Sequence, residues 1–172
     1  MIKQNNLNRE KVSKAVSRLY SVQALFQMES VNLSVEQVQL EFSIYRDQEN
    51  IEFNNFGKAD LSFFKQILNG VIKNQNIIDQ VITDLLKDGW KFDRIDPTLR
   101  SIFRAASSEL LLGTPPKVVI NEFLEIAKAF FPKGQECKLV NGILDGLAKK
   151  LMKSETIANK IGNQKKSFQR IS

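Results

Sequence analysis

The dipeptide Asn-Gly occurs twice between apolar residues, in ILNGVI at 67–72 and in LVNGIL at 139–144. Asn-Gly is the strongest short-range signal for a β-hairpin, which needs alternating apolar residues on both sides. Here the apolar residues recur every three or four positions instead, which is the spacing of a helix. We therefore place Gly70 and Gly142 inside helices. Because glycine in a helix costs about 1 kcal/mol relative to alanine, we expect each to allow close approach of a neighbouring helix.

The same spacing continues along most of the chain and predicts an all-α fold of about seven helices, packed as two small bundles. Ser34 and Gln37 match a capping box, and Asp60 is placed to cap the next helix. Asp96-Pro97 combines a capping carboxylate with a proline in the first turn. The expected helices cover 9–29, 34–48, 60–74, 76–88, 96–112, a stretch opened by TPPK (114–117) and ending near 131, and 135–152.

The 172 residues suffice for one domain with a sizeable core. We place a single helical domain over 9–152, with sub-bundles at about 9–90 and 91–152. Residues 1–8 are expected to form a mobile basic arm, and 153–172 a basic, disordered tail. There is no apolar run of membrane-spanning length and no apolar stretch of a secretory signal at the N-terminus. We therefore expect a cytoplasmic protein without a membrane partner.

The chain has no histidine and a single cysteine, Cys137. The commonest general base and metal ligand is therefore missing, and every thiolate zinc site is excluded. The sequence also lacks a glycine-rich phosphate loop, a nucleophile elbow and an HExxH motif. We expect a protein that is not an enzyme and that needs neither a metal nor a cofactor.

The net charge of +6 is concentrated at the two ends of the chain. Residues 1–18 carry five basic residues against one acidic residue, and residues 153–172 carry the same numbers. Basic ends of this kind often bind polyanions. For 153–172 a tail that only aids solubility is the simpler interpretation.

Basic residues also form a stripe on the first predicted helix. Lys11, Lys14 and Arg18 fall within about 60° of one another on a helical wheel. Three cations alone are most simply an ordinary solvated face. With Arg9 and Lys3 just upstream, the stripe favours contact with the phosphates of a nucleic acid.

Small residues follow the same helix on what the wheel predicts to be the far side from the core, namely Ser13, Ser17, Ser21 and Ala24. This strip offers a surface for a second copy of the chain. Four aromatic residues near the basic end are candidates for stacking on RNA bases, namely Tyr20, Phe26, Phe53 and Phe56. The position of Phe26 on the apolar stripe also fits a core residue, and for Trp90 we expect burial.

Five stretches form a specific combination of motifs: SRLYSVQALFQME (17–29), ILNGV, DPTLRSIFRAASSELL (96–111), PPKVVINEFLEIAKAFF and KLVNGILDGLAKKL. The combination resembles the NusB family of bacterial transcription antitermination factors. The VQAL segment is intact, and Arg104 and Glu109 match the ILR-x-x-x-x-EL helix of that family. The resemblance covers about 9–150.

The resemblance implies an all-helical protein that binds boxA RNA of ribosomal RNA operons. It implies binding together with NusE, a small-subunit ribosomal protein, in the RNA polymerase antitermination complex. The expected RNA contacts are Lys3, Arg9, Lys11, Lys14, Arg18, Phe26 and Lys138. We expect the protein partner on helix 96–112 and the 132–139 loop, through Leu99, Arg100, Gln135 and Leu139.

The chain departs from the family pattern at three of these positions. Phe26 stands where the family has tyrosine, Leu139 where it has phenylalanine, and Leu99 where it often has glutamate. The first helix is also less arginine-rich than usual, which puts the strength of RNA binding in question.

Two other functions stay open. One is a NusB-like interaction module that binds little RNA. The other is a relative of the NusB-like domain of RNA cytosine methyltransferases, although the glycine-rich cofactor loop needed for methyl transfer is missing here. The family includes monomers and dimers, so a homodimer is an alternative as well.

Overall fold

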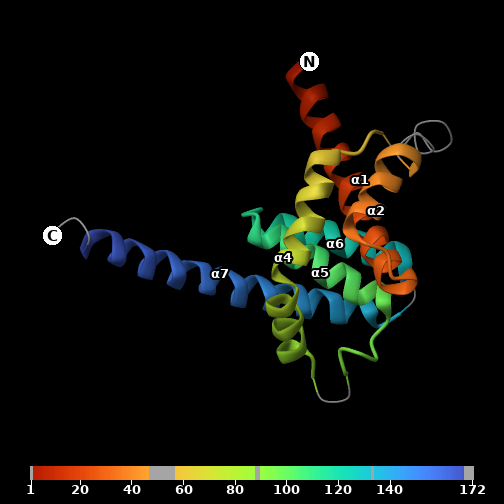
Figure 1. Ribbon diagram of the computed structural model, residues 1–172. Coiled ribbons are helices and arrows are strands. Elements are labelled where there is room, and N and C mark those ends of the chain that lie inside the picture. The colour runs from red at the N-terminus through yellow and green to blue at the C-terminus, as the bar shows by residue number, and fades with distance from the viewer. Residues whose placement is uncertain (1, 47–56, 88–89, 133, 169–172) are drawn as a thin grey trace.

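The structure is a computed structural model that describes the backbone of residues 2–46, 57–87, 90–132 and 134–168. Side chains are described for 6–44, 57–87, 90–132 and 134–152. Within these ranges the chain forms six α-helices and one π-helical turn, and no strand. They are α1 (Ile2–Val31), α2 (Val35–Glu41), η1 (Phe42–Arg46), α4 (Leu61–Leu85), α5 (Pro97–Leu111), α6 (Pro116–Phe130) and α7 (Glu136–Phe168). The predicted all-α fold is confirmed (Figure 1).

Four helices differ in extent from the prediction. The helix expected over 34–48 is α-helical only to Glu41 and continues as the π-helical turn η1, while 47–48 lie outside the described residues. A single helix, α4, replaces the two expected at 60–74 and 76–88. Neither glycine nor proline interrupts it near residue 75, and the Asn74 amide donates back to the carbonyl of Gly70 at 2.9 Å. Helix α1 begins at Ile2, within the stretch predicted as an arm, and α7 continues to Phe168, through most of the predicted tail. Figure 1 shows both helices projecting beyond the body of the protein.

The three predicted helix caps, Ser34, Asp60 and Asp96, are confirmed. Ser34 and Gln37 form the full capping box of α2. The Asp60 carboxylate accepts a hydrogen bond from the Phe63 amide at 2.9 Å, and that of Asp96 from the Thr98 amide at 2.7 Å. Each satisfies a backbone donor that the first turn of a helix leaves free.

Helix α5 is the centre of the protein, in contact with α1, α4, α6 and α7. The helices of the two predicted sub-bundles therefore share one core (Figure 1). The serines of α5 can be buried in this core because their hydroxyls form hydrogen bonds within the protein. Ser107 donates to the carbonyl of Phe103 at 2.7 Å, and Ser108 donates across to the carbonyl of Ile67 on α4 at 2.8 Å.

The two Asn-Gly glycines both lie inside helices, as predicted, but for different reasons. A Cβ on Gly70 would lie 2.2 Å from the Oγ of Ser108, so the expected close approach of two helices is confirmed there. At Gly142 that expectation is wrong, because nothing lies within 4 Å of such a Cβ. The close contact of α7 with α4 is made one turn later, where a Cβ on Gly146 would lie 2.6 Å from Leu85.

Over the described part of the chain, none of the helices combines the length and the apolar character required to cross a membrane.

Candidate nucleic-acid interface

Arg18 is not part of a surface stripe. It is 5% exposed, and its Nε and Nη2 donate to the two carboxylate oxygens of Glu109 at 2.8 and 2.7 Å. Its Nη1 donates to Glu122 on α6 at 3.1 Å. Burial alone would lower the pKa of Arg18, but the hydrogen bonds and charges of Glu109 and Glu122 raise it above its ordinary value. The guanidinium is therefore engaged in holding α1 to α5 and α6, and the expected free cation is not there.

The strip of small residues on α1 is inside the fold. Ser17, Ser21 and Ala24 have no exposed surface. Ser17 donates to the carbonyl of Asp60 at 2.8 Å, and Ser21 donates to the carbonyl of Ser17 at 2.8 Å. The prediction that this strip faces outward is wrong, so it offers no surface to a second copy.

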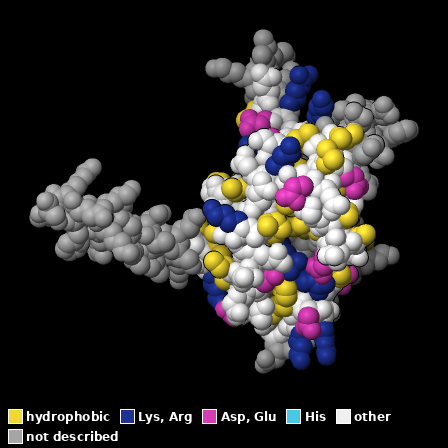
Figure 2. Space-filling model, in the orientation of Figure 1, with side chains coloured by type: hydrophobic (Ala, Val, Ile, Leu, Met, Phe, Trp, Pro, Cys, Tyr) yellow, Lys and Arg dark blue, Asp and Glu magenta, His cyan; other side chains and the backbone are white. Residues whose placement is uncertain are grey.

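The remaining cations of α1 stay on the surface. Arg9 and Lys11 are exposed, and Lys14 forms an ion pair with Glu10 at 3.0 Å. The Lys14 ammonium also lies 5.8 Å from the ring centre of Phe63. Figure 2 shows basic side chains along the projecting N-terminal part of α1, at the top of the view. The side chain of Lys3 lies outside the described residues, as do Phe53 and Phe56. Tyr20 is buried and packs edge-on against Phe42 and Phe64, so the prediction that it stacks on RNA is wrong.

Phe26 is a surface residue rather than part of the core, since it is 40% exposed. It lines a hollow of about 350 Å³ with Val31 of the same helix and Phe130 of α6, both of which are exposed. Among the described residues that line this hollow, none is charged. Its chemistry suits an apolar contact better than a phosphate.

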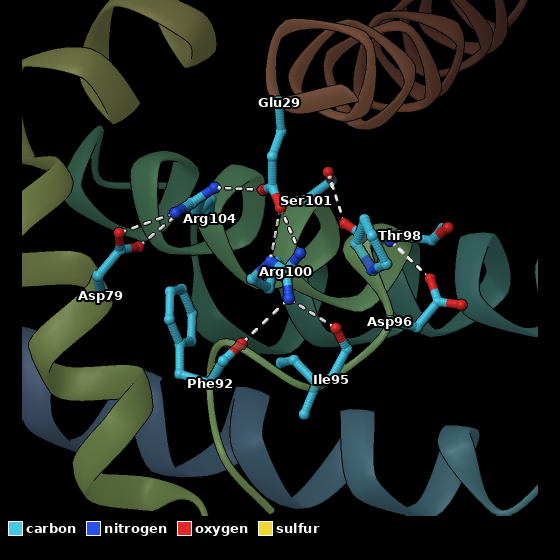
Figure 3. A network of polar contacts seen from close by, with 10 residues as sticks. Glu29, Asp79, Phe92, Ile95, Asp96, Thr98, Arg100, Ser101 and Arg104 are labelled. Carbon is cyan, nitrogen blue, oxygen red and sulfur yellow. Dashed lines mark hydrogen bonds and ion pairs between the residues drawn. The ribbon is translucent and has the colours of Figure 1, made fainter. Parts of the chain in front are cut away.

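The predicted partner contacts Leu99 and Arg100 are both buried. Leu99 is 1% exposed and belongs to the core. Arg100 donates to Glu29 of α1 through Nε at 2.9 Å and through Nη2, and its Nη1 donates to the carbonyls of Phe92 and Ile95 at 3.1 and 2.6 Å (Figure 3). Since Leu99 is buried in the core and Arg100 is 9% exposed and engaged by Glu29, the two side chains offer a docked partner little surface, and this part of the prediction is corrected.

Arg104 extends the same network toward α4. Its Nη1 donates to Glu29 at 2.9 Å, and its Nε and Nη2 donate to Asp79 at 2.8 Å each (Figure 3). Arg104 also lies 5.3 Å from the ring centre of Phe92. Glu29 thus joins two arginines of α5, and the network ties α1, α4 and α5 together.

Stability should depend on pH through Glu29. Burial raises the pKa of Glu29, but Arg100 and Arg104 lower it more, so it lies below its ordinary value of 4.5. The ionised carboxylate therefore stabilises the fold above its unfolded pKa, and this contribution is lost as pH falls through the folded pKa. We expect Glu29→Gln to lower the free energy of unfolding by about 1 kcal/mol at neutral pH, with the difference from wild type shrinking in acid. Urea unfolding over a pH series measures this, and a difference that does not vary with pH would contradict it.

Three other predicted residues do come together at the start of α7. Gln135 and Lys138 are exposed and Leu139 is half-buried. All three line a hollow of about 400 Å³, together with Leu85 of α4 and Trp90 of the segment before α5. Trp90 is 45% exposed, so its expected burial is wrong.

Comparison with known proteins identifies the family to which this arrangement of helices belongs. The model of the NusB family matches residues 15–149. The chain belongs to the NusB family. The transcription antitermination protein NusB of Caulobacter vibrioides is 42% identical over 138 residues, which are 79% of this chain and 92% of that protein. That of Bartonella quintana is 41% identical over 140 residues, covering 80% of this chain and 89% of that protein.

Solved NusB structures have the same fold. T. maritima NusB matches with a TM-score of 0.63 and 30% identity, covering 78% of this chain and 89% of that one. NusB from Aquifex aeolicus matches with a TM-score of 0.62 and 20% identity, covering 81% of this chain and 90% of that one. The resemblance indicated by the sequence motifs is confirmed.

Two features of the candidate surface were missed from sequence. Arg18 is held by the carboxylates of Glu109 and Glu122, which lie 91 and 104 positions away from it in the chain. Lys87 lines the hollow beside Trp90, but it belongs to none of the motifs recognised in the sequence. In both cases the relevant signal is the packing of distant helices, which local periodicity does not contain.

Proposed function

We propose that this chain is a transcription antitermination factor that binds boxA RNA of ribosomal RNA operons together with NusE. Membership of the NusB family and the names of its relatives support antitermination. The observation that carries RNA binding is the basic N-terminal part of α1, where Arg9 and Lys11 are exposed and Lys14 is half-buried. The protein acts by binding and not by chemistry, as a part of the RNA polymerase antitermination complex.

RNA phosphates are the natural ligands of this end of α1. Lysine and arginine side chains on a projecting helix reach a phosphate backbone without displacing any part of the core. Lys14 lies between Glu10 and the ring of Phe63, which limits its freedom. Arg9 and Lys11 are therefore the cations we assign most directly to phosphates, whereas Arg18 supports the helix from below.

The protein partner NusE is assigned to a different face. The hollow beside Phe26, Val31 and Phe130, whose described lining carries no charge, exposes three large apolar side chains. Apolar and aromatic side chains of this kind are enriched at protein contacts. We therefore place Phe26 in the NusE contact rather than in the RNA contact.

The first experiment is fluorescence anisotropy of a labelled boxA RNA and of a scrambled RNA of equal length, each with and without NusE. We expect a preference for boxA that NusE strengthens. Equal binding to both RNAs, unchanged by NusE, would overturn the proposal and favour the NusB-like interaction module.

Charge reversal at the surface of α1 then tests the RNA contact itself. For a single strand, each phosphate contact adds about 0.7 to the slope of log affinity against log salt concentration. Lys11→Glu should therefore weaken binding to both RNAs and reduce that slope by about 0.7. The matched control is Lys73→Glu, an exposed lysine on α4 with the same change of charge. If both variants lose affinity equally, the effect is one of net charge and α1 is not the RNA surface.

A further inference from the structure

The hollow assigned to NusE lies where three helices meet. Phe26 and Val31 line it from the last turns of α1, Thr98 from the first turn of α5, and Phe130 from the end of α6. Val31 is the final residue of α1. The shape of the hollow therefore depends on how the C-terminal end of α1 is held against the start of α5.

That end of α1 has little packing of its own. Ser30 is exposed, and Val31 is 65% exposed. Asn32 then takes a left-handed backbone conformation, with a φ of 58°, so the helix stops there. The last turn of a helix opens easily when few buried contacts hold it. A hollow of fixed shape therefore needs another means of holding this turn.

Glu29 supplies it through an ion pair with Arg100 of α5 (Figure 3). The Nε of Arg100 donates to Glu29 at 2.9 Å, and its Nη2 donates to the same oxygen. Its Nη1 donates to the carbonyls of Phe92 and Ile95, so the guanidinium is held on both sides. Because Arg100 is buried and these bonds are assisted by charge, they are among the stronger contacts that a side chain can make.

The other carboxylate oxygen of Glu29 is occupied as well. It accepts a hydrogen bond from Nη1 of Arg104 at 2.9 Å, and Arg104 donates to Asp79 of α4 through two bonds of 2.8 Å. Both arginines that hold Glu29 are thus fixed by groups outside α1. The end of α1 is therefore attached, through Glu29, to parts of the fold that are already held in place.

An ion pair of the opposite polarity joins α1 to α5 further toward the N-terminus of α1. There the cation, Arg18, belongs to α1 and the anion, Glu109, belongs to α5. At the C-terminal end α1 carries the anion and α5 the cation. A shift of α1 along α5 by one turn would separate both pairs at once. The two pairs together therefore fix the register and the direction of α1, which is the best attested use of charge pairs within a fold.

We propose that Arg100 and Glu29 are positioning residues for the NusE contact. Their ion pair holds Phe26 and Val31 in the arrangement with Thr98 that the partner meets. This role rests on the proposed placement of NusE at the hollow. Arg100, which the sequence predicted as a partner contact, thus serves the partner through the position of α1 rather than by touching it.

Two binding measurements on the full chain separate this role from a general effect on folding. One follows labelled NusE without RNA, and the other follows labelled boxA RNA without NusE, both by fluorescence anisotropy. Arg100→Met keeps a long side chain and removes its donors. We expect it to weaken NusE binding by about 2- to 30-fold, the range for residues that act on a site without touching the ligand. Binding of RNA alone should not change, because Arg18 still holds α1 nearer its N-terminus.

Substitutions at Glu29 test the same ion pair from the other helix. Glu29→Met should also weaken NusE binding, and Glu29→Gln should weaken it less, because one oxygen acceptor remains. In the Arg100→Met background, Glu29→Met should have little further effect, since the ion pair is already lost. Fully additive losses would mean that the two residues act separately, and would overturn the inference.

Gly70→Ala is the control for stability. It introduces a clash with Ser108 between α4 and α5 and leaves the ion pairs of α1 intact. Thermal unfolding shows how much stability each variant loses, and Glu29→Gln carries the test if Arg100→Met does not fold. Gly70→Ala should bind NusE as the wild type does. Equal weakening of NusE binding by Gly70→Ala and Arg100→Met would mean that lower stability, and not the position of α1, is the cause.

Phe26→Ala separates this role from the function on which it rests. If Phe26→Ala weakens NusE binding while Arg100→Met and Glu29→Met do not, the positioning role is wrong and the placement of NusE stands. If Phe26→Ala leaves NusE binding unchanged, NusE does not bind at the hollow, and the positioning role fails with that placement.

Discussion

Replacing Arg18 with alanine is expected to lower the free energy of unfolding by about 3–5 kcal/mol. The reason is the fate of Glu109, which is 0% exposed and forms two hydrogen bonds to the Arg18 guanidinium. Without Arg18 the fold must bury an uncompensated carboxylate. Glu122 contributes less, because its side chain is 40% exposed and can turn to water. Chemical denaturation of the two proteins measures the difference.

Two further variants show whether the loss of stability in Arg18→Ala comes from the missing charge partner of Glu109 or from the missing side chain. Lys11→Ala removes a cation of the same helix at an exposed position, and should change stability by no more than about 0.5 kcal/mol. Arg18→Met combined with Glu109→Met should recover much of the loss, because apolar pairs often replace buried ion pairs without cost. If Arg18→Ala alone costs as little as Lys11→Ala, the ion pair does not hold α1 in place.

Stability and the candidate surface are connected through this residue. Arg18 binds carboxylates on α5 and α6, and the exposed cations of α1 begin one turn before it. It is therefore a positioning residue: it fixes the direction in which Lys14 and Lys11 leave the body. A variant that folds without Arg18 should bind RNA more weakly although every surface cation is still present.

Local chemistry made most of the fold predictable. A cap such as Asp60 or Asp96 acts on backbone groups two or three residues away, so the sequence around it contains the whole interaction. The same holds for the apolar period around Gly70. The joining of two predicted helices into α4 was missed because a polar run without glycine or proline does not end a helix when both sides pack against the core.

The candidate site was less predictable because its residues meet only after packing. A helical wheel correctly places Arg18 beside Lys14. It does not show that Glu109, on another helix, lies within hydrogen-bond distance of Arg18. Serine counts as a polar residue on the same wheel. Ser17 and Ser21 are nevertheless buried, because each hydroxyl donates a hydrogen bond to a backbone carbonyl. Charge and polarity in a sequence therefore predicted a surface where the structure has an interior contact.

Gly70→Ala and Gly142→Ala are expected to change stability in opposite directions, although both glycines follow asparagine inside a helix. At Gly70 the added methyl group meets Ser108, so we expect a net loss of about 1–3 kcal/mol. At Gly142 the space is open, so the higher helix propensity of alanine should raise the free energy of unfolding by about 0.5–1 kcal/mol.

A double-mutant cycle with Ser108→Ala shows whether the clash at Gly70 has the assigned cause. The Ser108 Oγ would lie 2.2 Å from the new methyl carbon, whereas its Cβ would lie at 3.5 Å, an ordinary contact. Gly70→Ala should therefore be much less harmful in the Ser108→Ala background, with a coupling of about 1–3 kcal/mol. Additive effects would mean that the hydroxyl is not what keeps residue 70 glycine. A loss of stability at Gly142→Ala would contradict the open space found beside that glycine.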